Sequence, residues 1–366
     1  MTSSLVGSEM CIRDSAYSAD KWASLRDNVM EYGELADLVH EYNPTVRSNR
    51  STLSDKKNQD LTEINDKLLS DAMDLWDDAS STDTDSYMGR MTAANLDFAG
   101  NTLAQTADKN FMDAEMYKIS YDQTEANLVF QAQQLMTTYK QSAYTMENLN
   151  ANRALAQASY EATVARQAAG MATQTEVLTS LKNVQDIDAN ILSAQKSTDN
   201  VYRSLLLMLG WSADSQPEIR DIPEPDLARI GAMDPDADRE QALANNYEIK
   251  SDEHKLQNLK TNEQADATKA DLEDKRNQVY SSLKTQYNAV LDAKDALDAA
   301  NIKLQLETVN MNAASAKAAT GNISALELIQ QQTSYTTAKN SVETGKMQLT
   351  LAMEKYDWIK KGLTFS

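Results

Sequence analysis

The side chains that most often carry catalytic chemistry are scarce in this sequence. Two histidines, His40 and His254, and one cysteine, Cys11, occur among 366 residues. A Cys/His metal site or a Cys/His nucleophilic pair needs several such groups close together, so neither is expected. The ten glycines form no GxGxxG or P-loop pattern, which argues against nucleotide chemistry. We therefore expect no catalytic residue, no cofactor and no metal site, and the chain is predicted not to be an enzyme.

One local pattern comes nearest to a metal motif. Asp37 and His40 have the carboxylate-x-x-His spacing seen in di-iron helical bundles. Those bundles use Glu and need the motif twice, whereas His254 has Ser251 three residues before it. The pattern is therefore interpreted as a coincidence on a polar helix.

A turn sequence that occurs twice is the most informative feature of the chain. Its members are Gly170, Thr173 and Glu176 in the first copy and Gly321, Ser324 and Glu327 in the second. A glycine commonly adopts the left-handed conformation that ends a helix, and Ser or Thr with Glu three residues later forms a capping box that starts the next. Each copy thus predicts a sharp reversal between two helices, at residues 170–173 and 321–324.

The apolar residues after each turn follow a seven-residue period. The offset of 151 residues between the two glycines (321 minus 170) carries one set onto the other. The first set is Val177, Val184, Ile191, Thr198 and Leu205, and the second is Leu328, Tyr335, Val342, Leu349 and Tyr356. Such a heptad period is typical of coiled-coil seams. The predicted fold class is all-α, with two tandem repeats of long antiparallel coiled-coil helical hairpins.

Residues 236–320 contain neither Gly nor Pro, and apolar residues again recur every seven positions. This stretch predicts a helix of roughly fifty residues, about 75 Å long. A shorter helix should precede it, and the polar residues 261–268 are the predicted break between the two.

Composition divides the rest of the chain. Four of the five prolines fall within residues 211–236, which are predicted to link repeat 1 (residues 16–210) to repeat 2 (residues 237–366). Residues 60–117 are an excess in repeat 1, expected to form extra helices or a mobile loop rather than strands. Residues 1–15 resemble a translated sequencing-adapter read, so they are predicted to be a non-native leader that replaces any signal peptide.

Charge and hydropathy limit the partners. The formal charge is −20, which disfavours nucleic acids and anionic lipid surfaces. No run of about eighteen apolar residues predicts a membrane-spanning helix. Without Cys11, which lies in the predicted leader, the chain has no cysteine, and this is compatible with an extracytoplasmic protein.

The two turns, Asn43-Pro44 and the run Leu207-Met208-Leu209-Gly210 together resemble the TolC family of outer-membrane efflux proteins, over roughly residues 25–366. The resemblance implies a homotrimer whose helices enclose a tunnel. It also implies that the turns dock on a periplasmic-type adaptor (membrane fusion) protein, which connects the tunnel to an ABC or other inner-membrane exporter. The chain would then be the exit duct of an export or efflux system in the cell envelope, at an outer membrane or a cell wall.

By the same resemblance, particular residues acquire expected roles. The adaptor-docking residues are Arg166, Gly170, Thr173, Lys317, Gly321 and Ser324, and the acidic residues of the tunnel mouth are Glu176 and Glu327. A second interpretation needs no partner. A cation in the last helical turn offsets the helix dipole, and both glutamates are explained by capping alone.

One departure from the family is expected. Its members carry a strand hairpin in each copy that builds a membrane-spanning barrel, whereas residues 60–117 and 261–280 lack the alternating polarity of such strands. We therefore expect a TolC-like α-barrel protomer with little or no β-barrel. The alternative function is a structural or adhesive cell-surface coiled-coil protein without transport activity.

Overall fold

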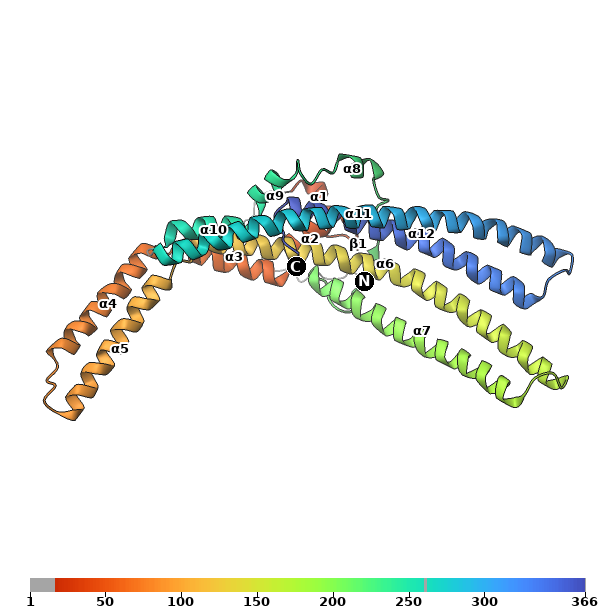
Figure 1. The fold of residues 1–366 in the computed structure, drawn as a ribbon, viewed down its shortest axis with the longest axis horizontal. Coiled ribbons are helices and arrows are strands. Elements are labelled where there is room, and N and C mark those ends of the chain that lie inside the picture. The colour runs from red at the N-terminus through yellow and green to blue at the C-terminus, as the bar shows by residue number, and fades with distance from the viewer. Residues whose placement is uncertain (1–16, 260–261, 366) are drawn as a thin grey trace. The chain divides into compact units, whose positions relative to one another are not determined.

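The computed structural model describes residues 17–259 and 262–365, and 82% of it is helical (Figure 1). The long helices are α4 (Leu61–Ser81), α5 (Tyr87–Lys109), α6 (Ala114–Ala168), α7 (Gln174–Met208), α11 (Asn262–Ala319) and α12 (Ala325–Lys360). The shorter elements are α1 (Ala19–Ser24), η1 (Tyr32–Glu34), α2 (Leu35–Tyr42), α3 (Pro44–Lys56), α8 (Leu227–Ala232), α9 (Arg239–Asn245) and α10 (Tyr247–Asn258). Two strands of two residues each, β1 (Val29–Met30) and β2 (Glu218–Ile219), pair in parallel. The all-α prediction is confirmed.

The chain forms two compact units, and each draws on both predicted repeats. Unit 1 comprises the described residues up to Asn43 with Leu128–Pro235 and Lys284–Trp358. Unit 2 comprises Pro44–Asn127, Asp236–Leu283 and the described residues from Ile359 onward. The helices α6 and α11 contribute residues to both units.

Unit 1 is a layer of helices in the order α7, α6, α12, α11 (Figure 1). The α6 residue Arg153 pairs with Asp188 of α7 through atoms 2.5 Å apart. On its other side α6 bonds to α12, where Asn340 Nδ2 donates to Asn148 Oδ1 over 2.9 Å. The α12 backbone in turn accepts a 2.9 Å bond at Ala352 O from Gln286 of α11. Thus α6 and α12 are the inner helices of the layer, and α7 and α11 are its edges.

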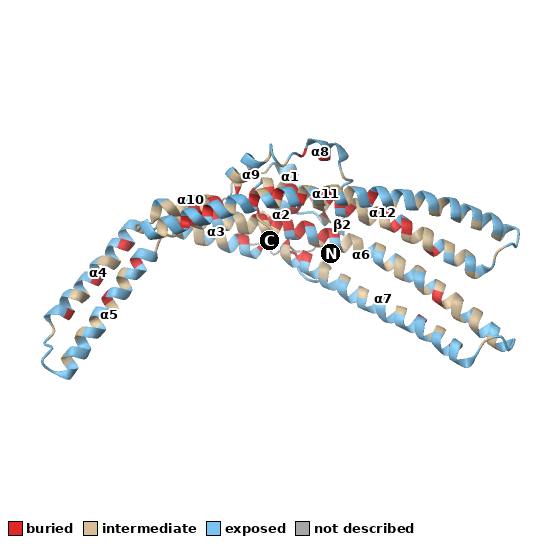
Figure 2. Ribbon diagram, viewed as in Figure 1, coloured by how far each residue is buried: buried red, intermediate tan, exposed pale blue. Residues whose placement is uncertain are grey.

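The heptad seams lie inside this layer. Val177, Val184 and Leu205 of α7 are buried, as are Val342, Leu349 and Tyr356 of α12. Ile191, Thr198, Leu328 and Tyr335 are half-buried, and Figure 2 shows that burial thins out towards the turns. The predicted seam therefore holds. Its outer part is less covered because a single layer of helices gives each side chain fewer neighbours than a globular core does.

In each repeat, an asparagine side chain near the start bonds to a backbone carbonyl at or near the glycine that ends the repeat. In unit 1, Asn43 Nδ2 donates to Met208 O over 2.8 Å, two residues before Gly210. In unit 2, Asn246 Nδ2 donates to Gly362 O over 3.1 Å. Gly210 and Gly362 both have positive φ, at 75° and 115°. Duplication of the fold is therefore visible in how the repeats end as well as in their turns.

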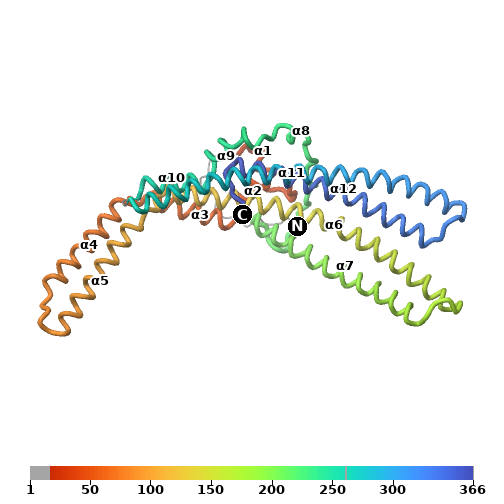
Figure 3. The backbone as a smooth tube through the Cα atoms, in the orientation of Figure 1, coloured from red at the N-terminus to blue at the C-terminus, as the bar shows by residue number. Residues whose placement is uncertain are grey.

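The excess residues of repeat 1 form a helical hairpin in unit 2, and Figure 3 traces the chain out along α4 and back along α5. Small residues line its seam: Ala72 and Ala79 of α4 and Gly100 and Ala107 of α5 are buried. A Cβ on Gly100 would lie 2.6 Å from Trp76 Nε1, so glycine is needed for this close approach. Extra helices, rather than a loop, therefore account for most of residues 60–117.

The predicted break at residues 261–268 is wrong for most of its length. Thr261 lies outside the described residues, but Asn262 to Thr268 are the first turns of α11. Acidic residues stabilise the start of a helix, and Glu263 and Asp266 lie there. The buried Thr268 hydroxyl donates a hydrogen bond to Gln264 O of the same helix over 2.9 Å. The polarity of the stretch marks a solvated helix start rather than a break.

Candidate functional site

The first turn has the geometry that its sequence predicts. Gly170 has φ of 73°, and Met171 N donates to Arg166 O over 2.8 Å, which is the bond that ends a helix in a Schellman motif. The next helix starts with a capping box. Thr173 N donates to Glu176 Oε2 over 2.6 Å, and Glu176 N donates back to Thr173 Oγ1 over 3.2 Å.

The second turn repeats these contacts. Gly321 has φ of 72°, and Asn322 N donates to Lys317 O over 2.8 Å. Ser324 N donates to Glu327 Oε2 over 2.8 Å, and Glu327 N donates to Ser324 Oγ over 3.2 Å. Both turns lie at the same end of unit 1 (Figure 1). The structure therefore presents two nearly identical, solvent-exposed tips.

The two cations beside the tips differ in their contacts. Arg166 Nη2 donates to Met171 O over 3.2 Å, so the guanidinium also closes the turn. This contact fits the capping interpretation of Arg166. Lys317 occupies the equivalent position on α11 with an exposed side chain. A partner could contact either cation from solvent.

The two glutamates are held in their ionised form. Hydrogen bonds from the Thr173 backbone N–H and then its hydroxyl lower the pKa of Glu176. The backbone N–H and hydroxyl of Ser324 lower the pKa of Glu327 in the same way. Both carboxylates are therefore anionic at neutral pH, and each tip presents one fixed negative charge beside a cation four residues before the glycine.

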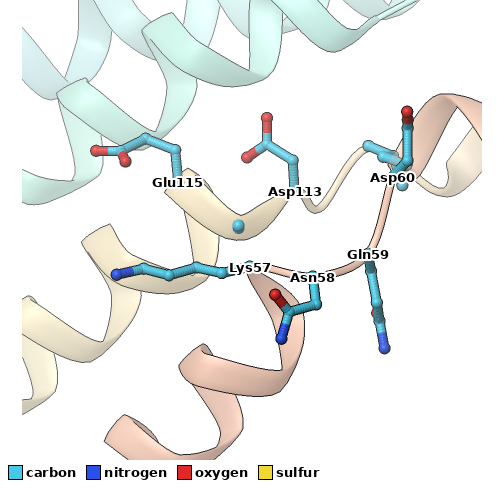
Figure 4. Close-up of a pocket in the computed structure, with 8 residues that line it drawn as sticks. Lys57, Asn58, Gln59, Asp60, Asp113 and Glu115 are labelled. Carbon is cyan, nitrogen blue, oxygen red and sulfur yellow. The ribbon is translucent and has the colours of Figure 1, made fainter.

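A shallow pocket of about 440 Å³ lies in unit 2, between the end of α3 and the start of α6 (Figure 4). Figure 4 shows Asp113 and Glu115 on one side of it and Lys57 and Asn58 on the other. The Asp113 carboxylate is already engaged, because it lies 2.6 Å from His254 Nε2 and accepts a 2.9 Å bond from Asn258 Nδ2. The pocket is thus the joint at the base of the α4–α5 hairpin.

Asp113 is an ionic anchor at that joint. Burial alone would raise its pKa, but hydrogen bonds from the Met116 backbone N–H, then from Asn258 and His254, outweigh burial and lower it. Asp113 and His254 are 141 residues apart in sequence, so local spacing could not predict their contact. Over the part of the chain that the structure describes, no group of three or more His, Cys, Asp or Glu side chains could hold a metal ion.

Sequence reasoning missed the outward faces of the edge helices. In α11, Ile302, Leu306 and Val309 are exposed apolar residues spaced by four and three positions. They lie opposite the buried seam of the same helix, which includes Val290 and Leu297. A search for a second apolar stripe on the far side of each predicted helix would have found them.

The fold defines a class. A duplicated helical hairpin with paired glycine turns is the TolC-like protomer fold, and solved structures of channels have it. The Campylobacter jejuni CmeC outer membrane channel matches with a TM-score of 0.58 at 9% identity, covering 97% of this chain and 91% of that one.

Two further channels match in the same way. The outer-membrane channel OprN has a TM-score of 0.56 at 11% identity, covering 96% of this chain and 94% of its own. The channel-forming protein CusC has a TM-score of 0.55 at 13% identity, covering 86% and 96%. Neither a protein-family model nor a curated protein matches the sequence. The TolC-like fold is thus established by structure, across nearly the full length of these channels.

None of the helices in residues 17–259 and 262–365 is both long and apolar enough to cross a membrane.

Proposed function

We propose that this protein is the exit duct of an export or efflux system, a homotrimer whose helices form a tunnel. The observation that carries the proposal is that, in the described part of the chain, the two edge helices of unit 1, α7 and α11, each lack a neighbouring long helix on one side. Among the described residues of unit 1, the inner helices α6 and α12 each have a long helix on both sides, whereas α7 and α11 each have one on a single side. Joining the α11 edge of one copy to the α7 edge of the next gives every helix two neighbours and closes the layer into a ring.

The α11 edge is built for such a contact. Ile302, Leu306 and Val309 form an apolar stripe, with Ala313 and Ala316 continuing it towards the tip. The side chain of Ile302 is 68% exposed in the single chain. An exposed stripe of this kind, directly opposite a buried one, is typical of a helix that packs on two partners.

The α7 edge offers a matching surface. Leu178 and Leu192 are exposed and lie about a quarter turn round α7 from Val177 and Val184, respectively. Between them the same face carries Lys182, Gln185 and Ala189, so a neighbouring helix meets one cation there rather than a row of like charges. A heterologous contact that closes after three copies produces a ring.

The tips are the proposed docking points. Gly170, Thr173, Gly321 and Ser324 shape two exposed reversals, and Arg166 and Lys317 place a cation beside each. A helical hairpin of a periplasmic-type adaptor would contact them, with an ABC or other inner-membrane exporter upstream. Glu176 and Glu327 would give the tunnel mouth negative charge, which favours cations over anions. The proposed location is the cell envelope.

The decisive experiment is the mass of the purified full chain by light scattering, with electron microscopy of the particles. We expect a mass of three chains and ring-shaped end views. Leu306→Glu should reduce the assembled fraction at least tenfold, because a charge would be buried at the contact. Asn301→Glu, on the same helix but off the stripe, should leave it unchanged. A monomer without a central opening would overturn the proposal, and a ring that fails to bind its adaptor would support the structural coiled-coil alternative.

A further inference from the structure

The α5 helix has two apolar faces, and only one of them is used within the chain. Its inner face, including Leu96, Gly100, Leu103 and Ala107, packs against α4. Its outer face carries Tyr87, Met91, Ala94 and Phe98, all exposed. The exposed fraction reaches 69% for Tyr87 and 73% for Phe98. Figure 2 shows the outside of this hairpin as largely solvent-accessible.

The spacing of the outer face is that of a coiled-coil seam. Successive members are four, three and four residues apart, so Met91 and Phe98 take a positions and Tyr87 and Ala94 take d positions. The stripe runs for roughly 16 Å along the helix. A strict a/d stripe is narrow and suits another helix, whereas a surface helix that packs on a core has a wider apolar face.

The charges of α4 and α5 indicate which helix of a second copy can pack against this stripe. The α4 helix carries six acidic residues and one lysine, and all seven side chains are exposed. The α5 helix is balanced, with Asp97 and Asp108 against Arg90 and Lys109. Two hairpins from different copies can therefore approach with α5 facing α5, whereas an approach through α4 sets acidic faces against each other.

An anionic lipid surface fits the stripe less well. Residues 61–109 contain ten acidic residues and three basic ones. Helices that lie on membranes usually carry Lys and Arg along the polar face, and α5 has only Arg90 and Lys109. The observations thus favour a second copy of this chain as the occupant.

We propose that the α5 helices of neighbouring copies pack against one another through Tyr87, Met91, Ala94 and Phe98, as a parallel seam around the threefold axis, with α4 on the outside. The proposal rests on the trimer proposed above and adds a second, separate contact between its subunits. At the flanking positions a parallel seam brings Arg90 near Asn95 and Asp97 near Thr102, so no like charges meet.

The test is cysteine cross-linking in the full chain after Cys11→Ser. Ala94→Cys places a thiol in the seam, and Ser70→Cys places one on the outer side of α4 as a matched exposed control. Under mild oxidation Ala94→Cys should form an intermolecular disulfide at least tenfold faster than Ser70→Cys. Met91→Glu, added to Ala94→Cys, should abolish that difference. Met73→Glu should not, although Met73 is exposed to a similar degree, 59% against 45% for Met91.

The outcomes separate this proposal from the tunnel. A three-chain mass with no preferential cross-linking of Ala94→Cys overturns the α5 seam and leaves the trimer standing. Preferential cross-linking in a particle of two chains supports pairing through α5 and overturns the threefold arrangement. If a fluorophore on Ala94→Cys instead enters an apolar environment only when zwitterionic lipid vesicles are added, a lipid surface is the occupant and the proposal fails.

Discussion

At the scale of single residues, the two tips are determined by a few local bonds. Gly170 and Gly321 adopt nearly the same φ, and the cap after each is closed by a hydroxyl and a carboxylate. These bonds join residues three to five positions apart, so the sequence alone was sufficient to predict them. The roles of Arg166 and Lys317 in docking depend on a second molecule and stay predictions.

The caps lead to a pH-dependent prediction. The folded pKa of Glu176 and of Glu327 lies below the unfolded value, so each cap contributes fully above the unfolded pKa and is lost as pH falls through the folded one. At neutral pH, Ser324→Ala should speed amide exchange in the first turn of α12 about fivefold, the usual effect of losing a helix cap. Hydrogen–deuterium exchange measures this.

The control for this experiment is acid. Exchange at the start of α12 should rise in both the wild type and Ser324→Ala as Glu327 becomes protonated, because in both chains the carboxylate accepts from the backbone N–H of residue 324. Exchange that stays pH-independent, after correction for intrinsic rates, would mean that the carboxylate does not stabilise the tip.

At the scale of elements, a glycine is needed where two elements approach closely as well as where a helix ends. Gly210 has a positive φ like that of Gly170, but a Cβ on it would lie 2.6 Å from the Tyr42 carbonyl oxygen. At Gly170 the same Cβ would meet nothing within 4 Å. The closing residue of the repeat is therefore constrained by both backbone conformation and space.

This difference gives a matched pair of substitutions. Gly170→Ala should lower the free energy of unfolding by about 1 kcal/mol, the cost of a left-handed non-glycine residue. Gly210→Ala should lower it by about 3 kcal/mol, because overpacking adds to the backbone strain. Urea denaturation followed by circular dichroism compares the two. Equal losses would show that the contact with Tyr42 relaxes without cost.

Helix periods were easier to predict than connections between distant elements. The heptads predicted the long helices and the buried seam of α12, because a seven-residue period can be recognised within one continuous segment of sequence. The α4–α5 hairpin was anticipated only as extra helices or a mobile loop, because its seam of Ala72, Ala79, Gly100 and Ala107 is made of small residues rather than bulky apolar ones. The contact of Asp113 with His254 joins separate segments, and no local pattern signals it.

At the scale of the whole molecule, assembly should govern stability. The edge stripes of α7 and α11 and the outer face of α5 leave large apolar side chains in water in the single chain. Burying them between copies would stabilise the native state by mass action. The trimer was predicted only as an implication of the resemblance to a channel family. Sequence periodicity alone could not predict it, because a helix edge that packs on another copy and one that faces solvent can have the same period.

We therefore expect the melting temperature to depend on protein concentration. A tenfold dilution of the wild-type chain should lower it by a few degrees, whereas Leu306→Glu should melt lower and show no such dependence. Differential scanning calorimetry over a range of concentrations measures this. A melting temperature that is independent of concentration in the wild type, in the range where the oligomer dissociates, contradicts assembly through the edges.

The way in which the α4–α5 hairpin leaves and rejoins the rest of unit 2 has an evolutionary and practical consequence. Asn65 Nδ2 donates to Asn110 O over 3.0 Å, and Asn110 Nδ2 donates to Asn65 Oδ1 over 2.9 Å. The points of exit and return are therefore adjacent and tied together. A single insertion could add such an arm to an ancestral repeat without disturbing its neighbours, and the same two asparagines mark where a protein engineer could exchange the arm for another helical hairpin.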